Sequence, residues 1–101
     1  MKYKIILVSG VDDDIADAIE WYENQQSGLG IKFIEDWESA VNYIITEPLA
    51  FEIKFKTFRH AGFKTFPFLI IYEFENNVIK VYSVIHAKRF PKKRYKRNTK
   101  K

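Results

Sequence analysis

The chain has 101 residues, 47% of them hydrophobic and none of them cysteine, which is enough apolar material to bury one core without disulfide or metal staples. We therefore expect a single domain over residues 1–101, and the lack of cysteine suits a reducing cytoplasm. No apolar run approaches the roughly 20 residues of a membrane span, and the apolar part of the N-terminus is too short for a secretory signal. The sequence thus predicts a cytoplasmic protein without membrane contact.

The net charge of +4 is unevenly distributed along the chain. Residues 12–47 hold ten acids and one lysine, a net charge of −9, whereas residues 48–101 carry a net charge of +11. The last stretch, 88–101, holds nine Lys or Arg and no acid. This split indicates an electrically two-sided molecule with an anionic partner on its basic side, although a solubilising tail explains the C-terminal charge about equally well.

A short strand and a helix are predicted first. The β-branched run Tyr3–Val8 is typical of an edge strand. The three aspartates at 12–14 then supply an N-cap and carboxylates that suit the positive end of a helix dipole. Apolar residues recur at helical spacing at Ile15, Ile19 and Tyr22, and we expect this helix to end within 24–27.

A second helix is predicted directly after Gly28, Leu29 and Gly30, a link in which both glycines are free to adopt left-handed conformations. Pro48 ends this helix at Glu47, because helices rarely continue into a proline. Its apolar stripe is Phe33, Trp37, Val41 and Ile44. The two helices should form a hairpin that buries Trp37 and leaves Trp21 as the more exposed tryptophan.

After Pro48 the period of the apolar residues changes to two. Residues 51–58 alternate and predict a second strand, which leads through Arg59 and His60 toward Gly62. The run 66–74 is apolar on both faces, as expected of a central strand buried on two sides.

A β-hairpin is predicted from this central strand onward. Tyr72 should be a core residue whose hydroxyl group is hydrogen-bonded. Asn76 and Asn77 tolerate the positive φ of a two-residue turn, and residues 79–85 supply the return strand.

The order of elements predicts an α+β fold, β-α-α-β-β-β, in which the helical hairpin packs on one face of a twisted antiparallel sheet. A basic tail follows over residues 91–101. We expect the other sheet face to be basic and concave, with Arg59, His86, Lys88 and Arg89 near one end.

Three runs of residues and one proline span nearly the whole chain: DIADAIEWYENQQSGLGIKFIEDW, Pro48, FRHAGFKTFPFLIIYEF and VIHAKRFP. Their most specific pieces are the WYE helix before the GLG link, the FPF-x-I-x-Y strand, and the spacing of His86, Arg89 and Pro91. Together they resemble the RelE/ParE superfamily of toxins from bacterial type II toxin–antitoxin pairs. The resemblance implies the same architecture, a helical hairpin against a twisted antiparallel sheet.

The function that this resemblance implies depends on the branch of the superfamily. ParE-like members, the plasmid stabilisation toxins, poison DNA gyrase, whereas RelE-like members cut messenger RNA on the ribosome without a metal. RNA-cutting relatives generally carry an arginine three residues before the tyrosine that aligns with Tyr72, and this chain has Leu69 there. The resemblance therefore favours a ParE-like toxin that binds a large target, is neutralised by a cognate antitoxin, and need not be an enzyme; homodimer formation stays open.

Metal-free RNA cleavage would need a base, an acid and cations around the scissile phosphate. The candidate catalytic residues for that alternative are His86, Arg89 and Arg59, although His86 is about equally well explained as a strand-end residue held by a neighbouring carbonyl group. The candidate residues for binding a partner or nucleic acid are Arg59, His60, Lys64, His86, Lys88 and Arg89.

A stand-alone nucleic-acid-binding module ranks third, since the tail supplies charge but no aromatic-studded sheet motif is present. The sequence has no zinc-ligand spacing, glycine-rich phosphate loop or nucleophile elbow, so neither a metal nor a cofactor is expected.

Overall fold

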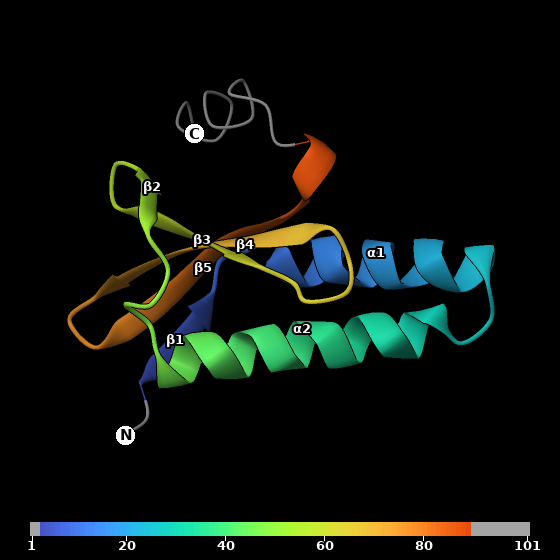
Figure 1. Ribbon diagram of the computed structural model, residues 1–101, viewed down its shortest axis with the longest axis horizontal. Coiled ribbons are helices and arrows are strands. Elements are labelled where there is room, and N and C mark those ends of the chain that lie inside the picture. The colour runs from blue at the N-terminus through green and yellow to red at the C-terminus, as the bar shows by residue number, and fades with distance from the viewer. Residues whose placement is uncertain (1–2, 90–101) are drawn as a thin grey trace.

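Two helices cover one face of a five-stranded sheet in the computed structural model, which describes residues 3–89 (Figure 1). The helices are α1 (Val11–Gln25) and α2 (Leu29–Thr46). The strands are β1 (Lys4–Leu7), β2 (Ile53–Phe55), β3 (Phe58–Gly62), β4 (Phe68–Glu75) and β5 (Val78–His86), and a short 3-10 helix, η1 (Ala87–Arg89), follows. The predicted α+β class is confirmed, and the basic tail predicted over 91–101 lies outside the described residues.

The strand order is β1-β5-β4-β3-β2, with the predicted central strand β4 in the middle. The β2–β3, β3–β4 and β4–β5 pairs are antiparallel, whereas β1 runs parallel to β5. The sheet is therefore mixed, because the chain crosses from one edge over the helical hairpin before it builds the other strands.

One expected strand is two strands in the structure. The alternating run 51–58 is broken by a tight turn at Lys56 and Thr57, so that Phe55 pairs with Phe58 across a small hairpin. Lys56 takes the left-handed conformation with φ 54°, which side chains other than glycine or asparagine seldom adopt. A two-residue turn of this composition leaves the apolar alternation intact, so the sequence pattern did not reveal it.

The core lies between the helical stripes and one row of side chains on β4 (Phe68, Ile70, Tyr72 and Phe74). Phe33 and Ile44 of α2 are fully buried against this row, whereas Trp37, which we expected to be buried, is only partly so. Trp21 is 58% exposed, as predicted. The stability of the hairpin therefore depends on Phe33 more than on Trp37.

Tyr72 is fully buried, and its hydroxyl group donates a hydrogen bond of 2.6 Å to the carbonyl oxygen of Pro48. Burial raises the pKa of Tyr72 to about 12, against the opposing charge of Arg59. The prediction of a core tyrosine with a satisfied hydroxyl group is confirmed.

The link between the helices is closed by the Glu23 carboxylate. Its oxygens accept hydrogen bonds from the backbone N–H groups of Gly28 at 3.1 Å and Gly30 at 2.9 Å, at the start of α2. Gly28 has φ 96°, as predicted, but Gly30 is helical. A Cβ atom on Gly30 would lie 2.9 Å from Glu23 Oε1 and 3.3 Å from Ile19 Cγ2, so glycine there allows the helices to approach closely.

Glu23→Gln should flatten the loss of stability in acid. The hydrogen bonds from Gly30 and Gly28 lower the pKa of Glu23 from 4.5, so its carboxylate favours the folded state above pH 4.5. That contribution disappears as the pH falls through the lowered folded-state pKa. Urea unfolding between about pH 7 and pH 3 should show a smaller drop for Glu23→Gln than for the wild type. Glu20→Gln, which removes one charge from the exposed face of the same helix, is the control; equal drops in both variants would contradict the assignment.

Candidate partner-binding surface

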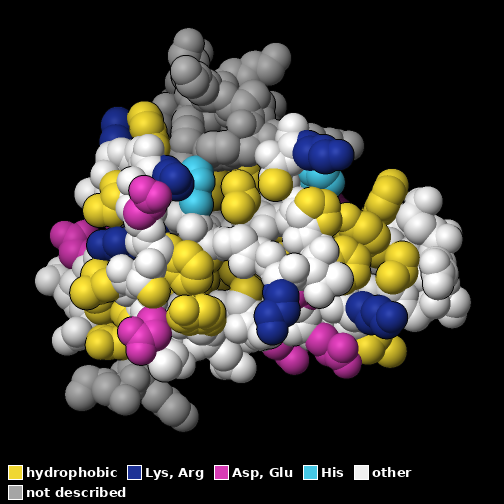
Figure 2. All heavy atoms as spheres, in the orientation of Figure 1, with side chains coloured by type: hydrophobic (Ala, Val, Ile, Leu, Met, Phe, Trp, Pro, Cys, Tyr) yellow, Lys and Arg dark blue, Asp and Glu magenta, His cyan; other side chains and the backbone are white. Residues whose placement is uncertain are grey.

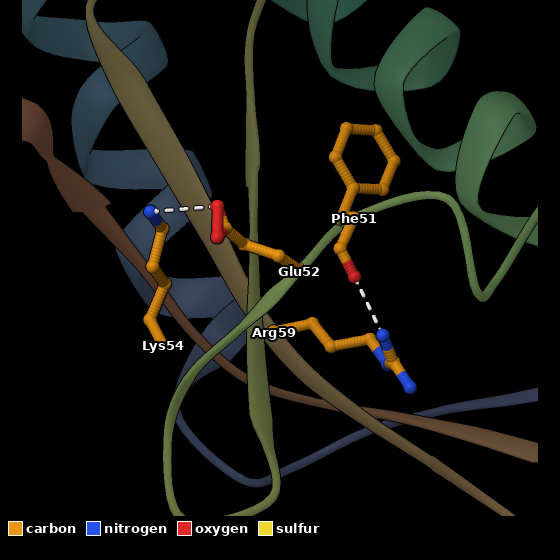
Figure 3. Close-up of polar contacts among 4 residues, drawn as sticks. All are labelled: Phe51, Glu52, Lys54 and Arg59. Atoms are coloured by element: carbon orange, nitrogen blue, oxygen red, sulfur yellow. Dashed lines mark hydrogen bonds and ion pairs between the residues drawn. The ribbon is translucent and has the colours of Figure 1, made fainter.

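The Arg59 side chain connects the sheet to the segment after α2 by a hydrogen bond. It lies in β3 opposite Tyr72, on the side of the sheet that faces the helices. Its Nη1 donates a hydrogen bond of 2.6 Å to the carbonyl oxygen of Phe51 (Figure 3). Together with the bond from Tyr72 to Pro48, this contact fixes the segment 48–52 at two carbonyl groups.

Beside Arg59 the chain exposes large apolar side chains. Tyr43 is 55%, Leu49 64% and Ile53 49% exposed, and the Tyr43 ring lies edge-on to Phe51 with 5.3 Å between ring centroids. We name these four residues the β2 patch: Ile53 begins the edge strand β2, Leu49 and Phe51 precede it in the connection, and Tyr43 lies near the end of α2. Contiguous exposed apolar side chains next to an open strand edge are typical of a protein–protein contact.

Basic residues follow the β2 patch in sequence. Residues 53–59 hold three Lys or Arg and no acid, while Glu52 lies within the patch segment. Lys54 forms an ion pair of 3.1 Å with Glu52, which at an exposed site contributes little to stability (Figure 3). Figure 2 shows hydrophobic, basic and some acidic side chains interspersed over the part of this face where β2 lies. The surface therefore suits a segment that is both apolar and acidic.

His60, also predicted as a binding residue, follows Arg59 in β3 but points to the opposite face, next to Ile71 of β4. Burial lowers the pKa of His60, and the charge of Lys54 lowers it further. His60 is therefore neutral at physiological pH and adds no positive charge to the surface.

His86 lies at a different place from Arg59. It ends β5 opposite Phe68 of β4, with 5.3 Å between ring centroids, and its Nδ1 accepts a hydrogen bond of 3.1 Å from the backbone N–H of Lys88. Since β3 and β5 flank β4 on opposite sides, and Tyr72 and Phe68 are four residues apart, the backbones at Arg59 and His86 are separated by roughly 16 Å. The predicted site residues therefore do not form one cluster.

The remaining predicted residues are Lys64, Lys88 and Arg89. Lys64 is exposed in the connection between β3 and β4, where its backbone N–H donates to Asp36 at 3.1 Å. Lys88 is exposed in η1, and Arg89 ends that helix, with its side chain outside the described part of the structure. Lys64 and Lys88 are thus accessible, but neither borders the β2 patch in sequence.

The expectation that Arg59 and His86 lie on the sheet face away from the helices is wrong, because they pair with Tyr72 and Phe68 of the core row. On β4 that face carries Leu69, Ile71, Glu73 and Glu75. Glu73 accepts hydrogen bonds from the hydroxyl groups of Thr57 and Tyr82, the latter at 3.0 Å. The face is acidic and apolar on this strand.

A β-bulge in β5 explains the position of His86. Ile71 pairs with Ser83 and Tyr72 pairs with Val81, so Tyr82 is an extra residue on β5. The extra residue reverses which face the following side chains occupy, and His86 consequently points to the helix side.

No family model and no curated protein matches this sequence. Among solved structures, the chain is similar to a chain described as "Chromosomal ParDE TA system from P. aeruginosa", with a TM-score of 0.73 and 11% sequence identity. The alignment covers 84% of this chain and 96% of that chain. The predicted fold, a helical hairpin against a twisted sheet, is thus shared with a chain of that ParDE system. At this identity the likeness concerns the fold alone, and function has to be argued from the surface.

Within residues 3–89, neither helix is long and apolar enough to cross a bilayer. In the same part of the chain, no group of three or more His, Asp or Glu side chains is placed to hold a metal ion.

Proposed function

We propose that this protein is the toxin of a type II toxin–antitoxin pair, that it belongs to the ParE-like branch, and that a cognate antitoxin neutralises it. The observation that carries the proposal is the likeness to a chain of a ParDE system over 96% of that chain's length. The exposed β2 patch supports it, because a protein that acts through partners needs an accessible apolar surface. The toxin acts in the cytoplasm by binding a large target, and DNA gyrase is the target to test first.

The alternative, cleavage of messenger RNA in the manner of RelE, needs an acid and a base on either side of one phosphate. Arg59 and His86, two of the candidate catalytic residues, are roughly 16 Å apart by strand spacing. Tyr72 is buried with a pKa of about 12, and its hydroxyl group donates a hydrogen bond to the carbonyl oxygen of Pro48. The position three residues before it is Leu69. These features favour binding over RNA cleavage.

The proposed function is tested by expressing the chain in bacteria with and without the product of the neighbouring reading frame. Growth arrest that the neighbour relieves, together with inhibition of DNA supercoiling by purified gyrase, is the expected result. Position-specific cuts in translated messages that His86→Ala abolishes would instead support the RelE alternative. Growth unaffected by the chain alone would contradict both.

The antitoxin is proposed to dock on the β2 patch as an extended segment that carries apolar and acidic residues. Apolar contacts with Leu49 and Ile53 supply most of the affinity, since exposed ion pairs contribute only about 0 to 1 kcal/mol each. Lys54 and Lys56 act mainly on the encounter, because complementary charge raises association rates. The outer edge of β2 offers backbone groups to pair with the segment.

Reversing Lys54 and Lys56 to Glu should slow antitoxin association several-fold at low salt and flatten its salt dependence. Leu49→Ser should instead speed dissociation, because it removes apolar contact without changing charge. Surface plasmon resonance at two salt concentrations separates the two effects.

Lys88→Glu is the matched control at the other predicted basic position, remote in sequence from the patch. If Lys88→Glu slowed association as much as the double reversal, or if the Leu49→Ser complex dissociated at the wild-type rate, the antitoxin would dock elsewhere.

A further inference from the structure

A cleft of about 390 Å³ opens between α1 and the ends of β4 and β5, away from the β2 patch. Its volume is at the small end of the range of roughly 300 to 1,000 Å³ seen for ligand pockets, which suits one long side chain rather than a nucleotide or a folded element. The lining residues are Asp14, Asp17, Ala18, Trp21, Tyr22, Phe68, Val84, Ile85 and His86.

Aromatic side chains from both layers form its walls. Trp21 and Tyr22 of α1 lie edge to face with 5.0 Å between ring centroids, and Phe68 of β4 lies 6.2 Å from Tyr22. Trp21 lines the cleft although it is mostly exposed, so its ring is available to a ligand. The faces of such rings attract cations as well as apolar groups.

Two carboxylates are the charged side chains among the described lining residues. Asp14 and Asp17 are three residues apart on α1 and therefore share a helix face, and within residues 3–89 no described Lys or Arg side chain lines the cleft. The helix itself carries six carboxylates and no basic residue. The His86 Nδ1 accepts a hydrogen bond from the backbone N–H of Lys88. Asp17 gives the described lining of the cleft a negative charge, which disfavours phosphates and other anions.

We propose that this cleft binds the guanidinium or ammonium group of an Arg or Lys side chain in a basic segment of a partner protein. The alkyl part of that side chain packs on Trp21 and Phe68, and its charged end is held by Asp17 and by the ring faces. The charge complementarity is opposite to that of the β2 patch, so the two surfaces select different segments. This site does not depend on the toxin–antitoxin proposal.

The test uses a short peptide with one central arginine, compared with the same peptide carrying citrulline, which has the same shape without the charge. Binding is followed by the indole N–H signal of Trp21 in NMR spectra, assigned with Trp21→Phe, while the Trp37 indole serves as an internal reference. The Trp21 signal should shift to saturation with the arginine peptide. The affinity of the citrulline peptide should be at least about tenfold lower, because it loses the cation–π and charge-assisted contacts. Equal affinity for the two peptides, or no shift at Trp21, would overturn the proposal.

Asp17→Asn should weaken arginine binding several-fold. Glu20→Gln removes the same charge from the same helix but does not line the cleft, and it should leave the affinity within about twofold, since an exposed and more distant charge is screened. Equal weakening by the two variants would mean that the peptide senses the general charge of α1, and the site would be rejected. Neither experiment involves the antitoxin or the target, so a failure here is distinguishable from a failure of the proposed function.

Discussion

Phe33→Ala should lower the free energy of unfolding by about 3 to 5 kcal/mol. The ring is fully buried where the two layers meet, with centroid distances of 5.7 Å to Tyr22, 5.2 Å to Phe66 and 5.1 Å to Phe68. Its removal costs the transfer free energy of the ring and leaves a cavity among other aromatic groups that cannot easily close it.

Urea unfolding of Ile31→Ala provides the control, since Ile31 lies on the same helix but is exposed, and its loss should change stability by about 0.5 kcal/mol or less. A loss below about 1 kcal/mol for Phe33→Ala would show that the helices do not pack on the sheet as described.

Asp36→Ala should cost about 3 kcal/mol, because it leaves three backbone donors without their acceptor. The Asp36 carboxylate is only 7% exposed and accepts N–H hydrogen bonds from Lys64 at 3.1 Å, Thr65 at 2.8 Å and Phe66 at 2.7 Å. These bonds hold the connection between β3 and β4 against α2. Asp36→Asn keeps one acceptor oxygen and should fall between the wild type and the alanine variant.

Glu35→Ala, at the exposed neighbouring position, is the control for the loss of one carboxylate from α2. Hydrogen exchange adds a local readout. The amides of 64–66 should exchange faster in Asp36→Ala, while the relative exchange rates among the amides of β5 should stay the same. Equal stability of Asp36→Ala and Glu35→Ala would show that the three hydrogen bonds are not formed in solution.

The parts of the fold that were predicted correctly depend on local signals. The apolar stripes of α1 and α2 follow from spacing within each helix, and the turn at Asn76 and Asn77, with φ 54° and 63°, follows from residues that tolerate that conformation. The turn at Lys56 and the bulge at Tyr82 were not predicted, because each is fixed by pairing with another strand. A single unpredicted bulge was enough to place His86 on the wrong face of the sheet.

The candidate site was predicted less well than the fold. Arg59 was singled out for its charge, and the structure does place it beside an accessible surface. Leu49 and Ile53 were missed, since an apolar residue near an alternating run looks like core in the sequence. Ile53 is exposed because β2 is a short strand at the edge of the sheet, and Leu49 is exposed in the turn after α2; no local pattern encodes either position.

The two side-chain bonds that fix the segment 48–52 bear on the thermodynamics of docking. A loop that is free in solution loses conformational entropy when a partner orders it, at a cost of roughly 1 to 2 kcal/mol for each residue. Here Tyr72 and Arg59 hold two carbonyl groups before any partner arrives, so most of that ordering has already occurred during folding. In the proposed complex, Arg59 therefore acts through the segment that it holds. Arg59→Lys keeps the charge but cannot reproduce the planar fork of donors, so it should leave Phe51 and Leu49 less well pre-organised for the proposed partner.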